Sequence, residues 1–376
     1  MQYITDKITL KYLFGLTCLG LSCFVQPISA SPSQIPLEAN AMHHAIQEKA
    51  TILILTTGGT IAGQATNDKE LGYQAAQTSG ESLIKSVPAL KNEANIEVCA
   101  ISQIGSQDMS DHVLLDLAHH IQKAEENPKI SGIVITHGTD TMEETAFFLN
   151  EVIPHHKPII LVGAMRPAGY ASADGSANLI DAVKVASNPL AQNRSVMVVM
   201  NDSIFAARSV QKMNTQNLDA FRAPNIGPIG VVNTEHVHFF QPAISQKSTT
   251  FMLPSQAPFP RVDIIYSHIQ MDGGLIEDAV KRGAKGIILA GVGDGNTSAD
   301  ALKALQEARK KGVIIVRSTR VGSGFVNRNV EVNDDQNQFI VSEDLNPQKA
   351  RLLLQILLAN KINNLDQIQK SFSILY

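Results

Sequence analysis

Short β-rich runs alternate with segments of helical period over residues 51–243, and this alternation limits the folds open to the chain. The runs lie at 51–56, 97–101, 132–136, 158–162 and 195–200. Neighbouring parallel strands need a long crossover between them, which is usually a helix. The pattern therefore predicts a larger N-terminal domain with a doubly wound, mostly parallel sheet.

A second α/β pattern follows residues 244–260, which contain three prolines and no periodicity and are expected to form a linker. Strands are predicted at 262–266, 286–290 and 313–317, and helices at 275–282 and 298–311. A glycine follows each helix, at Gly283 and Gly312, and Asn346-Pro347 favours the start of another helix. Residues 261–376 are thus expected to form a smaller C-terminal α/β domain.

The first thirty residues have the features of a secretory leader. Lys7 and Lys11 precede an uncharged run that ends near small residues, which predicts a signal peptide over 1–30 and an extension over 31–50. The run is short for a bilayer span, so a membrane anchor is the less favoured alternative. We expect a periplasmic or otherwise exported protein, free of the membrane after cleavage.

Cysteine and charge narrow the possible functions further. The leader contains Cys18 and Cys23, which match a lipidation site poorly and leave lipid attachment as a minor alternative. Cys99 then remains alone, so no intrachain disulfide can form, and its apolar surroundings predict a small buried side chain.

The net charge of −4 becomes −5 without the leader, whose charges are one Asp and two Lys. With no Trp and no basic run, nucleic-acid binding is disfavoured.

Two apolar strands each run into a turn that contains threonine. Residues 51–56 lead into Thr57-Gly58-Gly59-Thr60, and 132–136 lead into His137-Gly138-Thr139-Asp140. Ligands bind at the carboxyl ends of strands in open α/β sheets. A threonine nucleophile needs a tight turn, a nearby base and donors for an oxyanion, so this pairing points to one. Taken alone, the first turn could be only a tight strand-to-helix connection.

The second turn is followed by a capping-box pattern, Thr141 with Glu144, which predicts a helix over 142–152. If Thr141 caps this helix, the carboxylate of Asp140 is left for another task. Lys212 interests us only if it approaches Asp140, where it could transfer a proton. A solvated surface lysine is the alternative, and sequence spacing does not decide between them.

The sequence does not match the common cofactor-binding motifs. Gly291–Asn296 follows a strand, but its third glycine is one position early for a dinucleotide loop and Asp294 would repel a pyrophosphate. No phosphate-binding P-loop or G-x-S-x-G elbow is present. The paired histidines lack metal-site spacing and are expected to be solvated: His43-His44, His119-His120, His155-His156, His236 and His238.

Residues 55–62 and 132–141 resemble the two signature sequences of bacterial L-asparaginases, specifically the secreted type II asparaginases and glutaminase-asparaginases. Further segments are similar to the same family, at 104–109, 163–167, 199–202 and 345–351. The resemblance covers 51–376. It implies an exported amidohydrolase that acts on the small molecule L-asparagine, with L-glutamine as a second possible substrate, and that needs neither a metal nor an organic cofactor.

The resemblance also implies roles for individual residues. Thr60 matches the nucleophile that forms an acyl-enzyme and releases ammonia, and Tyr73, in the loop 64–80, matches the tyrosine that assists it. An ordinary loop tyrosine is the alternative for Tyr73. Thr139 matches the residue that activates water, Lys212 the one that tunes proton transfer, and Asp140 the one that takes the substrate α-amino group.

Other residues match substrate contacts. Within the first domain these are Gly59, Ser106, Gln107 and Ala164, of which Ser106 and Gln107 match the α-carboxylate contacts and Ala164 a backbone contact to the amide. Asn296 and Glu331 match residues that a neighbouring subunit supplies. The resemblance therefore implies a homotetramer built as a dimer of dimers.

The chain also departs from the family pattern. Asp294 stands where the family commonly has Asn, which adds a negative charge near Asn296 and Glu331. Residues 324–331 resemble glutaminase-asparaginases, whereas 105–108 resemble strict asparaginases, so the preference between asparagine and glutamine stays open. A periplasmic amino-acid-binding protein and a non-catalytic relative remain the competing functions.

Overall fold

The computed structural model describes residues 49–65, 73–74, 78–154, 156–243 and 251–373. Residues 48–376 form one compact unit. The predicted signal peptide lies outside the described residues, as do almost all of the extension, much of the loop 64–80 and the first half of the linker. Among the described residues, no helix is both long and apolar enough to cross a membrane.

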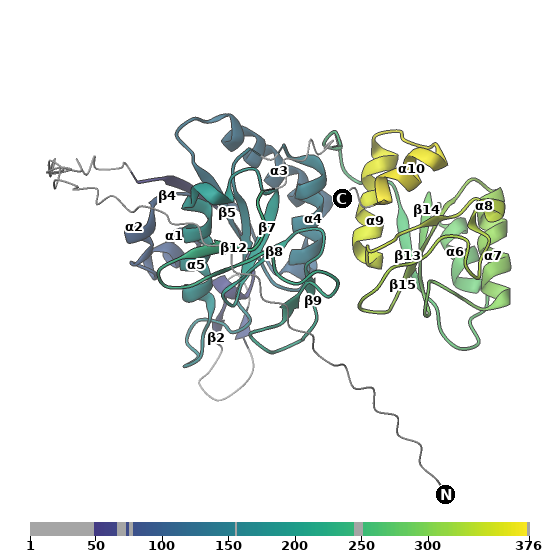
Figure 1. Cartoon of the computed structure of the whole chain (residues 1–376), viewed down its shortest axis with the longest axis horizontal. Coiled ribbons are helices and arrows are strands. Elements are labelled where there is room, and N and C mark those ends of the chain that lie inside the picture. Colours follow the sequence, from purple (N-terminus) through teal and green to yellow (C-terminus); the bar gives the residue numbers. More distant parts are fainter. Residues whose placement is uncertain (1–48, 66–72, 75–77, 155, 244–250, 374–376) are drawn as a thin grey trace, which may run out of the picture. The chain divides into compact units, whose positions relative to one another are not determined.

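The larger sheet has the strand order β12-β11-β8-β7-β6-β5-β1-β4 (Figure 1). Its parallel strands are β4 (Asn95–Ile104), β1 (Thr51–Gly58), β5 (Gly132–Thr136), β6 (Ile159–Val162) and β7 (Val196–Met200). Each overlaps a predicted run, which confirms the doubly wound, mostly parallel sheet. Three antiparallel strands extend it, and they are too short to show a period in the sequence: β8 (Ser203–Ala206), β11 (Gly230–Val232) and β12 (Val237–Phe239).

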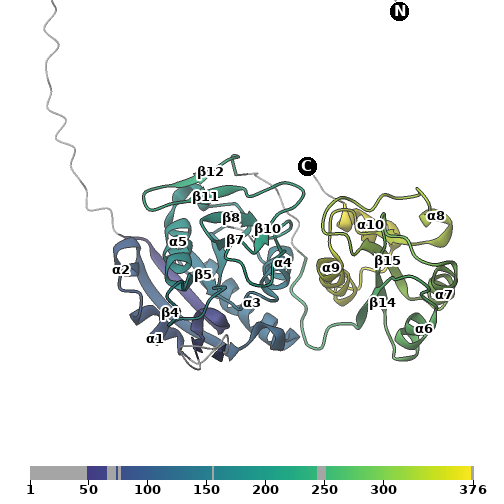
Figure 2. The same cartoon turned by 90° about the horizontal axis from the view of Figure 1, so that it is seen from below.

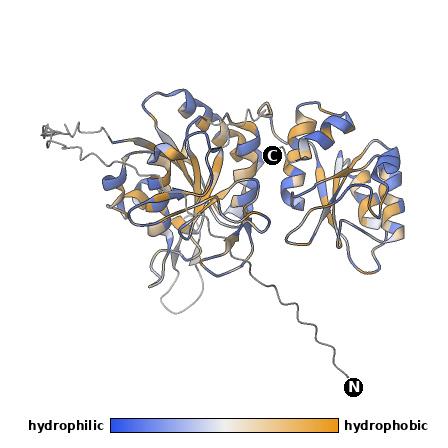
Figure 3. Cartoon of the chain, viewed as in Figure 1, coloured by the Kyte–Doolittle hydropathy of each residue, from blue (hydrophilic) through white to orange (hydrophobic). Residues whose placement is uncertain are grey.

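Helices cover both faces of this sheet. Figure 2 shows α3 (Asp111–Glu126) and α4 (Met142–Val152) on one side and α5 (Gly175–Ser187) on the other. Two shorter helices, α1 (Gly80–Lys85) and α2 (Leu90–Glu93), share the core cluster of α5. Successive residues of β5 alternate between the two core clusters, as the pleat requires. The central strands are therefore apolar on both faces, and Figure 3 shows them mostly in orange.

The smaller sheet is parallel throughout, in the order β13-β14-β15-β16. Its strands are β13 (Val262–Tyr266), β14 (Gly286–Gly291), β15 (Ile314–Thr319) and β16 (Ile340–Val341). Its helices are α6 (Gly274–Lys281), α7 (Ala299–Lys310), α8 (Asp334–Asn337), α9 (Pro347–Ala359) and α10 (Leu365–Phe372). Figure 2 shows α9 on one face of this sheet and α6 and α7 on the other. The predicted smaller α/β domain is confirmed, and only the very short β16 and α8 and the final helix α10 were not predicted.

The sequence signals for where helices start and end around the smaller sheet are confirmed. Gly283 and Gly312 have φ angles of 85° and 88°, the left-handed conformation that ends a helix. Asn346 accepts a hydrogen bond from the backbone N of Lys349, and Pro347 is the first residue of α9.

The described half of the linker packs against the larger sheet's helices. The ring of Phe259 stacks on that of Phe148 in α4 at a centroid distance of 5.7 Å, and its backbone N donates to Asp111 Oδ2 at 2.7 Å. Cys99 in β4 is partly buried and packs on the same core cluster, so it is less enclosed than predicted.

Candidate active site

The strand order places the two threonine turns side by side. Strand β1 pairs with β4 on one side and with β5 on the other. The chain passes from β1 to β4 and then crosses back over β1 to β5, which makes β1 a topological switch point. Ligand crevices form at the carboxyl ends of strands at such points. The turns that follow β1, β4 and β5 therefore meet at this end of the sheet.

Glycines allow these turns to touch. Gly59 has a φ angle of 80°, and a Cβ placed on it would lie 2.3 Å from Gly138 N. A Cβ on Gly138 would in turn lie 2.7 Å from the hydroxyl oxygen of Ser106. Any larger residue would collide with its neighbour, and in the first case the neighbour is backbone that cannot move aside. The close approach brings Thr60, Gly138 and Ser106 into one site.

Thr60 is the first residue of the short 3₁₀ helix η1 (Thr60–Ala62), where it is 7% exposed. Tyr73 lies in β3 (Tyr73–Gln74), which pairs antiparallel with β2 (Gln64–Ala65) directly after this helix. The backbone of Tyr73 therefore belongs to the hairpin that leaves the Thr60 turn. Its side chain and the tip of the hairpin lie outside the described residues.

Lys212 contacts the second threonine turn. It lies in β9 (Gln211–Lys212), and its Nζ donates to Thr139 Oγ1 at 2.8 Å and to Asp140 Oδ1 at 2.5 Å. The Lys212 side chain is 16% exposed and that of Asp140 is 62% exposed. The alternative of a solvated surface lysine is therefore wrong. Because Asp140 faces water, the ion pair adds little stability, and its main effect is to hold the ammonium group in place.

The prediction that the Thr141 side chain caps the following helix is wrong. Helix α4 does begin at Met142, but Thr141 Oγ1 donates to the backbone carbonyl of Ser106 at 2.8 Å instead. The backbone of Thr141, at φ −121° and ψ 16°, is also outside the extended region usual for a cap. The hydroxyl therefore ties the second threonine turn to the turn that carries the predicted carboxylate-binding residues.

Those two residues differ in exposure. Ser106 and Gln107 belong to η2 (Ser106–Asp108), where Ser106 is 4% exposed and Gln107 is exposed. Ser106 therefore faces the packed turns around Gly138, while Gln107 lies at the surface beside it.

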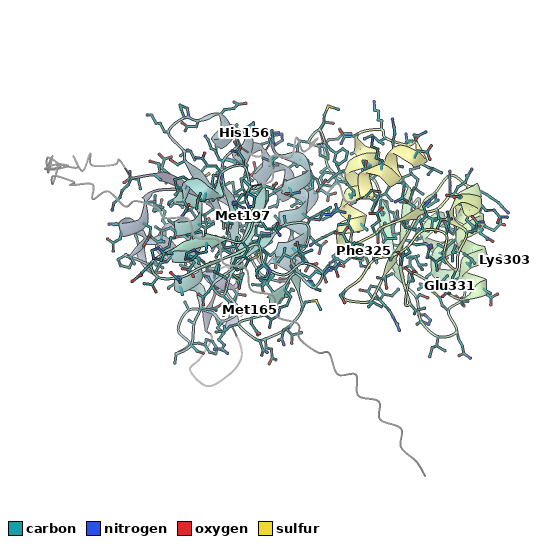
Figure 4. The ribbon with its side chains drawn as sticks, viewed as in Figure 1. His156, Met165, Met197, Lys303, Phe325 and Glu331 are labelled. Carbon is teal, nitrogen blue, oxygen red and sulfur yellow. The ribbon has the colours of Figure 1, made fainter. Side chains whose placement is uncertain are left out.

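The segment after β6 completes this end of the sheet. Ala164 is 1% exposed, and a Cβ on the preceding Gly163 would lie 2.7 Å from His137 O and 3.1 Å from Thr139 Cγ2. The backbone at Ala164 therefore passes close to the second threonine turn. Figure 4 labels Met165, the next residue, on this loop.

His137 is a buried part of the site that sequence reasoning missed, because only paired histidines were considered. Its Nδ1 lies 2.7 Å from Gly138 O and its Nε2 lies 2.9 Å from Thr145 Oγ1. Complete burial lowers its pKa to about 4, and the bond to the Gly138 carbonyl only partly opposes this. The ring is therefore neutral near pH 7, with Nδ1 donating to the carbonyl and Nε2 accepting from the hydroxyl.

Glu143 was also missed, since an acidic residue in the first turn of a helix is common. It is 4% exposed, and its Oε2 accepts a hydrogen bond from the backbone N of Lys212 at 2.6 Å. A buried carboxylate thus holds the strand that carries Lys212. Its position two residues after Thr141 was the only sequence signal.

Asn296 and Glu331 lie on loops of the smaller sheet, whereas the two threonine turns follow strands of the larger one. Lys212 lies in β9, which pairs with β10 (Phe221–Arg222) in a separate two-stranded sheet. Asn296 Nδ2 donates to Glu331 Oε2 at 2.8 Å, which joins these two predicted residues to each other. In the described part of the chain, Asn296 Oδ1 is buried without a hydrogen-bond partner. Glu331 extends from the loop after β15 (Figure 4).

The Asp294 side chain is held by hydrogen bonds within the same loops. Its Oδ1 accepts from the backbone N of Asn327 at 2.7 Å and its Oδ2 from Asn327 Nδ2 at 3.1 Å. Beneath it, Arg317 donates to the backbone carbonyl of Asp294 at 2.9 Å and forms a buried ion pair with Asp334. The carboxylate therefore links the loop of Asn296 to the segment that leads to Glu331.

The histidines expected to be solvated are exposed or half-buried where the structure describes them: His119, His120, His156, His236 and His238. His43, His44 and His155 lie outside the described residues. In the described ranges, no group of three or more His, Cys, Asp or Glu side chains is arranged to hold a metal ion.

Comparisons with known proteins identify the family that the chain resembles. The family model "Asparaginase, N-terminal" matches residues 51–245, and "Glutaminase/Asparaginase C-terminal domain" matches residues 261–372. "Probable L-asparaginase periplasmic" of Haemophilus influenzae is 43% identical over 309 residues, which cover 82% of this chain and 88% of that protein. "Glutaminase-asparaginase" of Pseudomonas fluorescens is 40% identical over 358 residues, which cover 94% and 98%. The crystal structure of "Probable Cytoplasmic L-asparaginase from Campylobacter jejuni" is similar with a TM-score of 0.82 at 42% identity, covering 86% of this chain and 99% of that one.

Proposed function

The chain belongs to the asparaginase family, whose N-terminal and C-terminal models both match it, and we propose that it hydrolyses L-asparagine to L-aspartate and ammonia. The observation that carries this proposal is the meeting of the two threonine turns, with Lys212 bound to Thr139 and Asp140. Relatives of similar length are named L-asparaginase and glutaminase-asparaginase, which supports the same reaction class.

In the first half of the reaction, Thr60 Oγ1 attacks the side-chain amide carbon of the substrate. The hydroxyl proton passes to a nearby base, for which Tyr73 on the adjoining hairpin is our candidate. The C–N bond then breaks, the amide nitrogen takes a proton, and ammonia leaves an acyl-enzyme on Thr60. We assign the contacts with the reacting amide to backbone groups at Gly59 and Ala164. The close approach of Gly59 to Gly138 supports this assignment.

In the second half, water attacks the acyl carbon and releases aspartate, which restores the Thr60 hydroxyl. Thr139 orients this water, and Lys212 and Asp140 hold and transfer the proton that it loses. The contact of Lys212 Nζ with both partners supports this assignment, because one ammonium fixes the hydroxyl and the carboxylate together.

The substrate is a small zwitterion, and the site offers groups of suitable charge for both ends. We assign the carboxylates of Asp140 and Glu331 to the α-ammonium group. Ser106 and Gln107 provide neutral donors for the α-carboxylate. Holding both ends orients the amide toward Thr60, which makes a weak nucleophile effective.

Ammonia release tests this function. Purified protein should release ammonia from L-asparagine, and Thr60→Ala and Lys212→Met should each reduce the rate at least 100-fold. Undiminished release by both variants would rule out the mechanism. A binding protein, the competing function, would return its ligand unchanged, and a non-catalytic relative would bind asparagine or aspartate without turnover. Parallel assays with L-glutamine measure the side activity.

We place the mature chain in the periplasm, with domains at 51–243 and 261–376 joined by the linker, and assembled as a homotetramer. The name of the Haemophilus relative supports the periplasm, whereas that of the Campylobacter structure points to the cytoplasm. N-terminal sequencing of protein from a periplasmic extract tests export. A mature chain that begins near residue 31 is the expected result, and an intact Met1 in the cytoplasmic fraction would contradict it.

A further inference from the structure

The carboxylate of Glu143 accepts hydrogen bonds from two distant parts of the chain. Its Oε2 accepts from the backbone N of Lys212 at 2.6 Å. Its Oε1 accepts from Asn346 Nδ2 at 2.9 Å and from Gln348 Nε2 at 2.7 Å. Glu143 lies in the first turn of α4, and the two amides flank the start of α9. One buried side chain thus joins the Lys212 strand to both helices.

Only a carboxylate satisfies these partners. All three are N–H donors, and the orientation of Asn346 is fixed because its Oδ1 accepts from the backbone N of Lys349 at 3.1 Å. A glutamine in place of Glu143 has one acceptor oxygen and one NH₂ group. Whichever way that amide turned, a donor would face a donor, at a position where the native side chain is 4% exposed.

A second group from α9 holds the same segment. Lys349 is 1% exposed, and its Nζ donates to the backbone carbonyls of Arg208, at 2.9 Å, and of Val210. The residues just before Lys212 are therefore fixed by Lys349, and Lys212 itself is fixed by Glu143. This matters because β9 has only two residues, so its own ladder holds it weakly.

We propose that Glu143 is a positioning residue that places the Lys212 ammonium against Thr139 and Asp140. A lysine side chain is long and flexible, so its end reaches two acceptors at once only if its backbone is held. Through Glu143, the first turn of α9 controls the proton transfer without touching the substrate. This inference depends on the proposed role of Lys212.

Steady-state kinetics of the full-length Glu143→Gln variant test the proposal. The kcat for L-asparagine should fall about 10- to 100-fold with KM changed less than threefold, because a displaced catalytic group affects the chemical step more than binding. Glu144→Gln is the matched control: it makes the same change one residue further along α4, where the described residues show no hydrogen bond or ion pair with Lys212. It should keep kcat within twofold.

A double-mutant cycle shows whether Glu143 acts through Lys212. In the Lys212→Met background, Glu143→Gln should reduce kcat no further. If it reduced kcat by the same factor as in the native background, or if folded Glu143→Gln kept its kcat, the proposal would be overturned. Full activity of Lys212→Met alone would instead reject the proposed function of Lys212, and the inference with it.

A milder variant covers the case in which Glu143→Gln does not fold. Gln348→Met removes one of the three donors and leaves the carboxylate in place, so it should fold and lower kcat severalfold at constant KM. Thermal unfolding of each variant confirms that folded protein is compared. A folded Gln348→Met with native kcat would count against the proposal.

Discussion

His137 and Lys212 both form hydrogen bonds in the second threonine turn, one as a neutral ring and the other as an ammonium group. Lys212 binds Thr139 and Asp140 through its ammonium group. His137 is buried and neutral, and it binds the Gly138 carbonyl and the Thr145 hydroxyl. The turn therefore depends on one charged and one uncharged side chain, and acid should disturb the second.

The lowered pKa of His137 predicts a loss of stability in acid. The unfolded chain binds a proton on this ring below pH 6.5, whereas the folded protein does so only near pH 4. The free energy of unfolding should therefore fall as pH drops from about 6.5 to about 4, by about 3 kcal/mol in total. Urea unfolding of the native protein and of His137→Asn, each at pH 7 and pH 4.5, measures how much of the fall in the free energy of unfolding is due to His137.

The comparison isolates His137 because all other groups are common to both proteins. Glu151 and Asp181, whose pKa values burial raises, favour the folded state as pH falls and would mask the effect in a single profile. Equal acid sensitivity in the native protein and the variant would show that His137 does not cause the loss.

At the scale of elements, the loops at the ends of the strands are joined in two different ways. The turn after β1 packs on the turn after β5 through Gly59 and Gly138. The loop after β14 is joined to the loop after β15 by the Asp294 carboxylate. In the first case bare backbone makes the contact, and in the second case a charged side chain does.

Gly59→Ala should therefore abolish activity and destabilise the protein. Its Cβ would lie 2.3 Å from Gly138 N, so the two turns must separate. Gly227→Ala is the matched control, since Gly227 has a similar φ of 75° but nothing within 4 Å of its Cβ position. The control should lose only about 1–2 kcal/mol from backbone strain and keep its activity. Activity assays and urea unfolding of both variants test this prediction. Equal losses of activity and stability in the two variants would contradict a packing effect at Gly59.

Substitutions of Asp294 should separate its charge from its hydrogen bonds. Asp294→Asn can still accept from the backbone N of Asn327 and can pair with its side-chain amide, so we expect KM for asparagine within about threefold of the native value. Asp294→Ala loses both bonds and should raise KM severalfold, because the segment that leads to Glu331 is released. The KM values of both variants for asparagine and for glutamine test this. If Asp294→Asn raised KM more than Asp294→Ala did, the charge of Asp294 would matter more than its hydrogen bonds.

At the scale of the whole molecule, one of the hydrophobic core clusters contains residues of both sheets. The cluster that contains Phe148 of α4 also contains residues of α9 and of the smaller sheet, and the linker residue Phe259 belongs to it. Polar contacts follow the same route, since Arg208 forms a bidentate pair with Asp344 at 2.6 and 3.1 Å. Residues 48–376 therefore form one unit, although the sequence pattern restarts after residue 260.

Subunit mixing tests whether a neighbouring subunit completes the site. Thr60→Ala and Glu331→Ala should each be strongly impaired alone. If Glu331 acts in the partner's site, a one-to-one mixture of co-refolded subunits should recover about a quarter of native activity, because half of the dimers are mixed and each has one intact site. A mixture of Thr60→Ala with Lys212→Met should recover nothing, since these two residues belong to the same subunit's site. No recovery in the first mixture would contradict a shared site.

Much of the fold was predictable because its signals are local. Apolar runs, helical periods and the ends at Gly283, Gly312 and Asn346 depend on residues a few positions apart. The placement of both threonine turns at strand ends followed from the same patterns. The short strands β8, β11 and β12 were missed because their few residues show no period.

The sequence by itself determined which side chains stand at the strand ends, whereas the tertiary structure decided what each of them contacts. Lys212 binds Asp140 across 72 residues, and Glu143 binds Asn346 across 203. Thr141 has a local role available, as a helix cap, but its hydroxyl donates to Ser106 across 35 residues. Local pattern fixes backbone conformation, while hydrogen-bond partners depend on which buried donors and acceptors the packed chain brings together.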